Sequence, residues 1–279
     1  MEPLTPVYTA DLLAPLSAEL VSLLRGLGEK DWTKPTVAGA WRVKDVAGHL
    51  LDGQLRKLAF GRDAGAHFDR GPASGAYADV VAFINELNVT GVGYAARLSP
   101  RLLTDLLEVT GEWVARYVVS LPPLGEARFA VDWAGEARSL NWMDTGREYT
   151  EHWHHQMQIR DAVGAPGMFQ PRWLDPLLDL SVRAFPRAYR DVAAPVGTAV
   201  TFEVEGHGER AWSLVREPSG WVVLRGRPAQ PAASVRADAD TAWRLLFNAL
   251  SPAAARERLT TTGDPALTGP LLAARSVMV

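Results

Sequence analysis

Hydrophobic residues recur at helical spacing through residues 10–164 of the chain. Apolar positions repeat every three or four residues in four stretches, which predicts helices near residues 10–25, 43–60, 77–98 and 101–121. A fifth helix is expected from Thr145 to Gly164. Thr145 and Glu148 match a capping box, and Gly164 followed by Pro166 is typical of a helix end. The connections are modest in length, so an antiparallel bundle is predicted.

The pattern changes after residue 168. A helix is expected from Leu174 to Arg190, and β-rich or alternating runs then predict strands over residues 199–205, 211–216, 221–225 and 233–237. Short helices are expected around residues 242–249 and 270–274, the second with proline at its first position. The prediction is therefore two domains, a helix bundle over residues 1–167 and a small α+β layer over residues 168–279.

Composition narrows the classes of function. With 22% charged residues and a net charge of −3, the chain lacks the basic footprint of a protein whose main partner is nucleic acid. It has no apolar run long enough to span a bilayer, which predicts no membrane partner and a cytoplasmic location. There are no cysteines, so disulfides, thiolate metal ligands and a cysteine nucleophile are excluded.

One face of the fifth helix carries the candidate chemistry. Residues three and four apart share a helix face, so acids and histidines lie in line with apolar positions further along: Glu148, Glu151, His152 and His155, then Ile159 and Ala162. A surface helix would place its charges opposite the apolar stripe. This arrangement favours a polar site near the end of a bundle, and we treat it as a metal-site hypothesis.

His49 offers a second histidine, on the apolar side of the 43–60 helix and next to Gly48. Two imidazoles and one carboxylate suit zinc, with a fourth position left open, although a core histidine bonded to a backbone carbonyl is the alternative. The residues alone leave the register open, because Glu148 with His152 has the same spacing as Glu151 with His155. Three other histidines are predicted outside the site: His154 facing away from it, His67 in a loop and His207 in a turn.

Two segments carry a family resemblance. The runs AWRVKDVAGHL (residues 40–50) and EHWHHQMQIRDAVG (residues 151–164) resemble the mycothiol-dependent maleylpyruvate isomerase family, part of the DinB-like group of helix-bundle metalloproteins. That family combines W-x-V-x-D-x-x-x-H with a later E-x-x-x-H, and these supply zinc ligands. The resemblance implies His49, Glu151 and His155 as the ligands. It also implies a DinB-like four-helix bundle followed by a domain similar to sterol carrier proteins.

The resemblance also implies a function. A metal ion (zinc, with nickel or another first-row ion as alternatives) would bind a low-molecular-weight thiol as thiolate. The thiolate would then add to a small electrophile, giving S-transfer or cis–trans isomerisation. The chain differs from the family pattern at two places that bear on the isomerase reaction. Gln158 stands where the family usually has an acid, and FNALSPAA (residues 247–254) replaces a Leu-x-Gly-Arg-like segment.

Other readings remain open at this point. One alternative is a non-enzymatic binding protein with a structural metal or an apolar-ligand site, and another is a metal-dependent hydrolase on the same bundle. The sequence does not decide between mycothiol, bacillithiol and glutathione, nor between a monomer and a homodimer. Metal content and thiol turnover are the observations that separate these functions.

Overall fold

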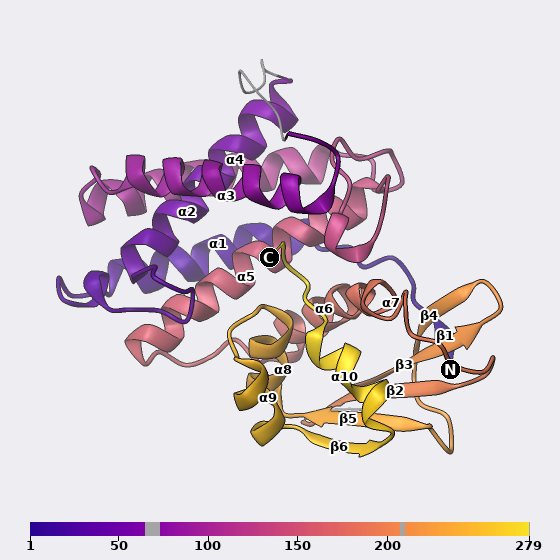
Figure 1. The fold of residues 1–279 in the computed structure, drawn as a ribbon. Helices are drawn as coiled ribbons and strands as arrows, with labels where there is room; N and C mark the ends of the chain where they lie inside the picture. Colours follow the sequence, from indigo (N-terminus) through magenta and orange to yellow (C-terminus); the bar gives the residue numbers. More distant parts are fainter. Residues whose placement is uncertain (65–72, 207–209, 279) are drawn as a thin grey trace. The chain divides into compact units, whose positions relative to one another are not determined.

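The computed structural model describes residues 1–64, 73–206 and 210–278, and it divides into two compact units (Figure 1). We call them the helical unit (Tyr8–Phe129 and Ser139–Met168) and the sheet unit (Met1–Val7, Ala130–Arg138 and Phe169–Val279). The predicted loop residue His67 and turn residue His207 lie outside the described residues.

Two short segments that precede residue 168 belong to the sheet unit, whereas the predicted division at residue 167 placed them in the bundle. Strand β1 (Glu2–Pro3) pairs antiparallel with β4 (Gly220–Arg225) at one end of the sheet. The 3₁₀ turn η3 (Asp132–Ala134) is held by Arg187, which donates to the Asp132 carbonyl at 2.6 Å. Both contacts join residues far apart in sequence, so no local pattern indicates them.

The helical unit contains five helices, among the residues described: α1 (Ala10–Arg25), α2 (Val43–Arg56), α3 (Tyr77–Ala95), α4 (Pro100–Ser120) and α5 (Asn141–Val163). Helices α1, α4, α2 and α5 contact one another in a closed ring, and α3 packs on the outside against α2. A short 3₁₀ turn η1 (Asp31–Thr33) precedes α2, and a π-helical segment η2 (Lys57–Arg62) follows it. None of the described helices is both long and apolar enough to cross a membrane.

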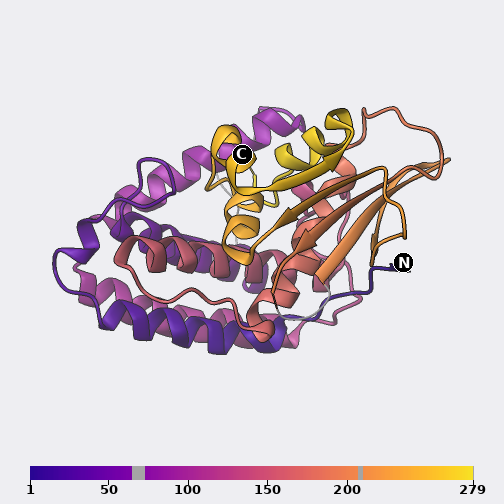
Figure 2. The ribbon, with the colours of Figure 1, turned by 90° about the horizontal axis from the view of Figure 1, so that it is seen from below.

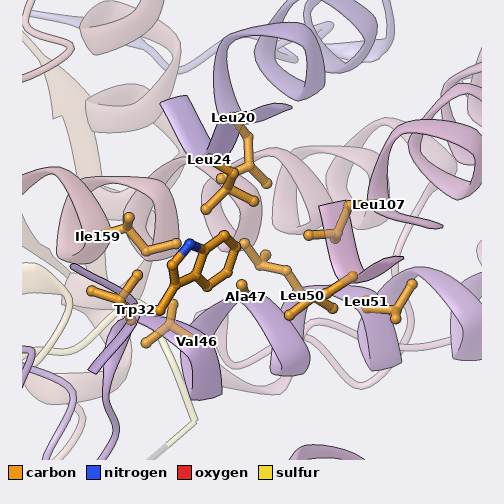
Figure 3. Packing of buried hydrophobic residues seen from close by; sticks show 11 residues of the cluster. Leu20, Leu24, Trp32, Val46, Ala47, Leu50, Leu51, Leu107 and Ile159 are labelled. Carbon is orange, nitrogen blue, oxygen red and sulfur yellow. The ribbon is translucent and has the colours of Figure 1, made fainter. Parts of the chain in front are cut away.

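The core of this unit forms where α1, α2, α4 and α5 meet (Figure 3). Trp32 of η1 lies among Leu24, Val46, Ala47 and Ile159, and each of these side chains is buried. Fully burying a Val, Leu or Ile side chain contributes roughly 1.5–3 kcal/mol. The core therefore fixes α2 against α5 with considerable free energy, and those two helices carry the candidate site.

Helix α5 begins four residues before the predicted capping box, so that prediction was wrong. Thr145 is buried inside the helix, and the N-cap position Leu140 has no side-chain cap. The amides of Asn141 and Trp142 instead donate to the carbonyls of Gly125 and Pro123, both at 2.9 Å. The preceding loop thus satisfies amides that the first turn leaves open. The predicted end is confirmed, with Gly164 in the left-handed conformation at φ 72°.

Close packing of α2 on α3 depends on Gly48. A Cβ added there would lie 2.6 Å from the Cβ of Ala95, whereas a Cβ added at Gly53, on the same helix, would meet nothing within 4 Å. Gly48→Ala is expected to destabilise the protein by about 1–3 kcal/mol through overpacking. Gly53→Ala is the matched control and should be neutral or stabilising by up to about 1 kcal/mol. Urea unfolding measures both, and equal free energies of unfolding for the two variants would contradict the packing argument.

The sheet unit is built on a mixed sheet, whose strands Figure 2 shows as arrows, mostly in orange. Its strand order is β1-β4-β3-β2-β5-β6. Besides β1 and β4, its strands are β2 (Ala199–Val204), β3 (Arg210–Glu217), β5 (Ala233–Ala237) and β6 (Thr260–Gly263). Strands β2 and β5 are parallel, and the other neighbours are antiparallel. The four predicted strands are present, while β1 and β6, which are too short or too polar to show a pattern, were missed.

Helices accompany this sheet: α6 (Pro171–Ser181), α7 (Phe185–Ala188), α8 (Ala239–Leu246), α9 (Pro252–Arg258) and α10 (Pro265–Ala273). The single helix predicted from Leu174 to Arg190 is divided into α6, a 3₁₀ turn η4 (Val182–Ala184) and α7. Pro186 explains the break, because it has no amide hydrogen and its ring crowds the carbonyl four residues earlier, on Val182. Helix α10 starts at Pro265 and not at Pro270, with the Asp264 side chain accepting from the amide of Ala266.

Candidate metal centre

Three side chains from two distant segments converge in the helical unit. The Nε2 atom of His49 on α2 lies 3.0 Å from Oε1 of Glu151 on α5, and Nε2 of His155 lies 3.1 Å from the same oxygen. One ligand atom from each residue falls within 4.8 Å of the other two. Among the described residues, this group could hold a metal ion.

The register of α2 on α5 follows from the apolar residues that flank the site. Val46 and Leu50 lie on either side of His49 along α2, and Ile159 lies one turn after His155 on α5. All three belong to the buried core, which Figure 3 shows from close by. The line of polar positions that the sequence indicated on α5 therefore continues into the buried core at Ile159.

Trp41 borders the site and was not identified as a site residue from the sequence. Its ring centroid lies 4.9 Å from that of His49 and 6.3 Å from that of His155. Its carbonyl accepts hydrogen bonds from both the amide and the hydroxyl of Thr36, which fixes the loop before α2. The signal that could have found it is its place at the start of the W-x-V-x-D-x-x-x-H pattern.

The other residues of that pattern have structural roles. Val43 is fully buried in the core, and the Asp45 carboxylate accepts from the amide of Arg42 at 2.9 Å. That bond satisfies an amide at the start of the helix and sets where α2 begins. The pattern therefore fixes the helix start, its packing and the position of His49 relative to Trp41.

Hydrogen bonding defines which nitrogen of His155 faces the site. The amide oxygen of Gln158 lies 2.7 Å from Nδ1 of His155, and an amide oxygen can only accept, so Nδ1 donates. In a metal-bound ring, Nε2 would then carry the lone pair that binds the ion. The Nδ1 atom of His49 is buried and has no hydrogen-bond partner among the described residues.

Electrostatics favour a neutral His49 ring beside an ionised Glu151 carboxylate. Burial lowers the pKa of His49, and repulsion from His155 lowers it further. Burial alone would raise the pKa of Glu151, but the charge and hydrogen bond of His155 and the hydrogen bond of His49 hold it well below its usual range. Two nitrogen donors and one carboxylate carry a single negative charge, which fits a divalent cation that takes nitrogen and oxygen ligands.

The site opens to solvent at its carboxylate. The two histidine side chains are only 7% and 8% exposed, whereas 34% of the Glu151 side chain is accessible. Catalytic zinc sites have three protein ligands and a fourth position for water or substrate. The exposure of Glu151 provides an approach for such a fourth ligand.

The other acid–histidine pair at this spacing, Glu148 and His152, makes different contacts. Glu148, the other acid at this spacing, lies 2.7 Å from Arg147 and 3.6 Å from Lys57. His152 is buried, with Glu148 and Glu151 both near enough to oppose the lowering of its pKa by burial. The packing therefore brings Glu151 and His155, and not Glu148 and His152, together with His49.

His154 was predicted to face away from the site, and that prediction was wrong. It is 3% exposed, its Nδ1 donates to the Thr150 carbonyl at 2.8 Å, and its ring centroid lies 3.9 Å from that of His155. Burial lowers the pKa of His154 to about 3, so its ring is neutral at physiological pH. His154 thus packs against a candidate ligand as an uncharged aromatic ring.

An ion cluster joins η2, which directly follows α2, to α5, and gave no signal in the sequence. Lys57 is 2.6 Å from Asp144, and Arg147 is 2.8 Å from Asp144. Burial raises the pKa of Asp144, but the charges of Arg147 and Lys57 outweigh burial and lower it overall. Together with Glu148, the cluster balances two positive and two negative charges beside the candidate centre.

Comparisons with known proteins identify relatives for most of the chain. The family model "Mycothiol maleylpyruvate isomerase N-terminal domain" matches residues 13–160, more than half of the chain, and this range includes all three converging residues. The crystal structure of the mycothiol-dependent maleylpyruvate isomerase aligns with a TM-score of 0.56 and 13% identity, covering 94% of this chain and 96% of that one. A mutant of that isomerase aligns with a TM-score of 0.52 and 14% identity, over the same shares of both chains.

No curated protein matches the chain. The two isomerase structures, at these identities, establish a shared fold over nearly the whole chain. The predicted fold class, a helix bundle followed by a small α+β domain, is therefore confirmed.

Proposed function

We propose that this chain, which belongs to the mycothiol maleylpyruvate isomerase N-terminal domain family, binds a divalent metal ion and uses a low-molecular-weight thiol as cosubstrate. The ligands would be His49, Glu151 and His155. The observation that carries the proposal is the convergence of these side chains on one small volume, with ligand atoms within 4.8 Å of one another. The site also lies inside the residues that the family model matches.

The donor set supports zinc over harder cations. Imidazole nitrogen suits zinc, copper, iron and nickel, whereas magnesium and calcium prefer oxygen ligands. When bound, such an ion would lower the pKa of a thiol and so present it as a thiolate at neutral pH. Glu151 would offset part of the positive charge, and the neutral rings of His49 and His155 would supply the remaining donors. Trp41 would form an apolar wall beside the bound thiol.

The thiol must come from outside the chain, because the chain contains no cysteine. Family membership supports a thiol-dependent enzyme of the isomerase or thiol-transferase kind. We propose that the thiolate adds to an electrophilic carbon of a small molecule. Loss of a leaving group then gives S-transfer, whereas bond rotation followed by loss of the thiol gives cis–trans isomerisation. A cytoplasmic location stays a prediction, as does the choice between monomer and homodimer.

The test begins with metal analysis of protein purified without chelator. We expect close to one equivalent of zinc or another first-row ion for each chain, retained on gel filtration. Thiol consumption is then measured with mycothiol, bacillithiol and glutathione against a panel of small electrophiles. The matched control is the same protein after chelator treatment, before and after zinc is restored.

The metal analysis and the thiol assays separate the proposed function from its alternatives. Thiol consumption that is lost with chelator and regained with zinc would support the proposal. Retained metal without turnover of any thiol would refute the thiol-dependent reaction and favour a hydrolase or a binding protein. Failure to bind any first-row ion would overturn the ligand assignment itself.

A further inference from the structure

Gln158 is the one residue whose side chain bonds to a proposed metal ligand on the side away from the metal, among the described contacts. Its amide oxygen lies 2.7 Å from Nδ1 of His155, and the residue is 4% exposed. It follows His155 by three positions on α5, so the two side chains share a helix face. The bond is therefore short, shielded from water and built into one helix.

His155 and His49 differ in whether Nδ1 has a hydrogen-bond acceptor. Nδ1 of His155 has an acceptor, while Nδ1 of His49 is buried without a partner among the described residues. An imidazole binds metal through a nitrogen that carries no proton, and the hydrogen bond at the other nitrogen selects which one that is. The Gln158 side chain thus favours one tautomer of His155, whereas Nδ1 of His49 has no such partner among the described residues.

The acceptor at Nδ1 of His155 is a neutral amide, and this affects the total charge of the metal site. Metal-bound histidines commonly donate to a carboxylate, which makes the ring a stronger electron donor. Gln158 is uncharged, so it orients the ring without adding a second negative charge near Glu151. A divalent ion held by this donor set would keep one net positive charge and remain a stronger Lewis acid than it would beside a second carboxylate.

We propose that Gln158 is a positioning residue, which holds His155 with its proton on Nδ1 and limits the negative charge of the site. This inference rests on the proposed function for its consequence, the affinity and acidity of the metal. Its structural part, the tautomer of His155, belongs to the metal-free protein. The two parts can therefore fail separately.

The first measurement uses metal-free protein with isotope-labelled histidine rings, assigned with a His155→Asn variant. Ring nitrogen chemical shifts distinguish a nitrogen that bears hydrogen from one that does not. In the unmodified chain we expect His155 to carry hydrogen on Nδ1, where Gln158 accepts. Gln158→Leu removes this acceptor at similar volume, so the hydrogen should shift to Nε2, where the Glu151 carboxylate accepts. Gln158→Glu keeps an acceptor and should keep the hydrogen on Nδ1.

The second measurement is zinc affinity, by competition with a chromophoric chelator. Gln158→Leu should weaken zinc binding roughly 10–100-fold, the usual effect of losing an outer hydrogen-bond partner. Gln158→Glu should bind zinc at least as tightly as the unmodified chain. The cobalt-substituted Glu variant should also show shifted absorption bands, because the stronger donor changes the ligand field.

Gln156 provides a matched control two residues away on the same helix. Its side chain is fully buried, and neither amide atom has a hydrogen-bond partner among the described residues. Gln156→Leu should leave both the tautomer of His155 and the zinc affinity unchanged.

An unchanged His155 tautomer in Gln158→Leu, with zinc affinity within two-fold of the unmodified chain, would overturn the positioning role. A tautomer that responds as expected in a chain that binds no first-row metal would support the positioning role of Gln158 while it refutes the proposed function.

Discussion

Glu151→Gln is expected to abolish metal retention and thiol turnover while leaving the fold intact. The substitution keeps the shape of the side chain but removes the only negative charge among the three converging groups. Both histidines point Nε2 at the Glu151 carboxylate, so the neutral amide would leave the cation without its charged ligand. The loss of metal affinity should exceed the ~100-fold that removal of an outer hydrogen-bond partner costs.

Metal content after gel filtration and a zinc titration measure this effect. Glu112→Gln is the matched control, because Glu112 lies on α4 of the same unit with a side chain that is 68% exposed. Its pairing with Arg116 at 3.9 Å is a surface contact, and such pairs contribute about 0–1 kcal/mol. His155→Ala should lose metal and activity in the same way. Full metal occupancy in either site variant would refute the ligand assignment.

Asp144→Asn is expected to cause the largest loss of stability, about 3–5 kcal/mol at neutral pH, as for other broken buried ion pairs. The carboxylate accepts from Lys57 at 2.6 Å and from Arg147 at 2.8 Å, and the Asp144 and Lys57 side chains are each 5% exposed. Without it, two cations would share one remaining acid, Glu148. The asparagine side chain can replace a hydrogen bond but not the charge.

The effect should depend on pH in a defined direction. The pKa of Asp144 is lowered in the folded state, so its ionised form stabilises the fold at pH values above the ordinary carboxyl pKa of about 3.9. This contribution is lost as pH falls from that value through the lowered one. The difference in unfolding free energy between the unmodified chain and Asp144→Asn should therefore be largest near pH 7 and shrink in acid.

Urea unfolding at a series of pH values measures both effects. Asp105→Asn serves as the control, since Asp105 is 52% exposed and lies 3.9 Å from both Arg25 and Arg101. Its substitution should change stability by no more than about 0.5 kcal/mol. A loss below about 1 kcal/mol for Asp144→Asn, or one that grows in acid, would show that the cluster does not stabilise the fold in this way.

The position of the candidate site along each helix could be predicted from the residues. Glu151 and His155 share a face because they are four positions apart, and helix geometry alone ensures this. His49 was recognisable because it interrupts an otherwise apolar face. The pairing of the two segments could not be derived in the same way, since 102 positions separate His49 from Glu151 and local spacing says nothing about such a distance.

Local spacing also fails to show which acid–histidine pair on α5 belongs to the site. Glu148 with His152 matches the spacing of Glu151 with His155, so the pattern is degenerate. The tertiary structure separates the two pairs by placing Lys57 beside Glu148, which also pairs with the preceding Arg147. The family resemblance favours the same pair, through the residues that follow His155.

By itself, the sequence determined the five helices of the helical unit, four strands of the sheet and which faces of them are apolar, because these properties depend on residues within one or two turns of each other. Only the tertiary structure decided where α5 begins, because carbonyls of a preceding loop cap its first amides. It also decided that Trp41 borders the histidines and that Lys57 meets Asp144. These features depend on contacts between distant segments, and such contacts exist only after the hydrophobic core has fixed α2 against α5.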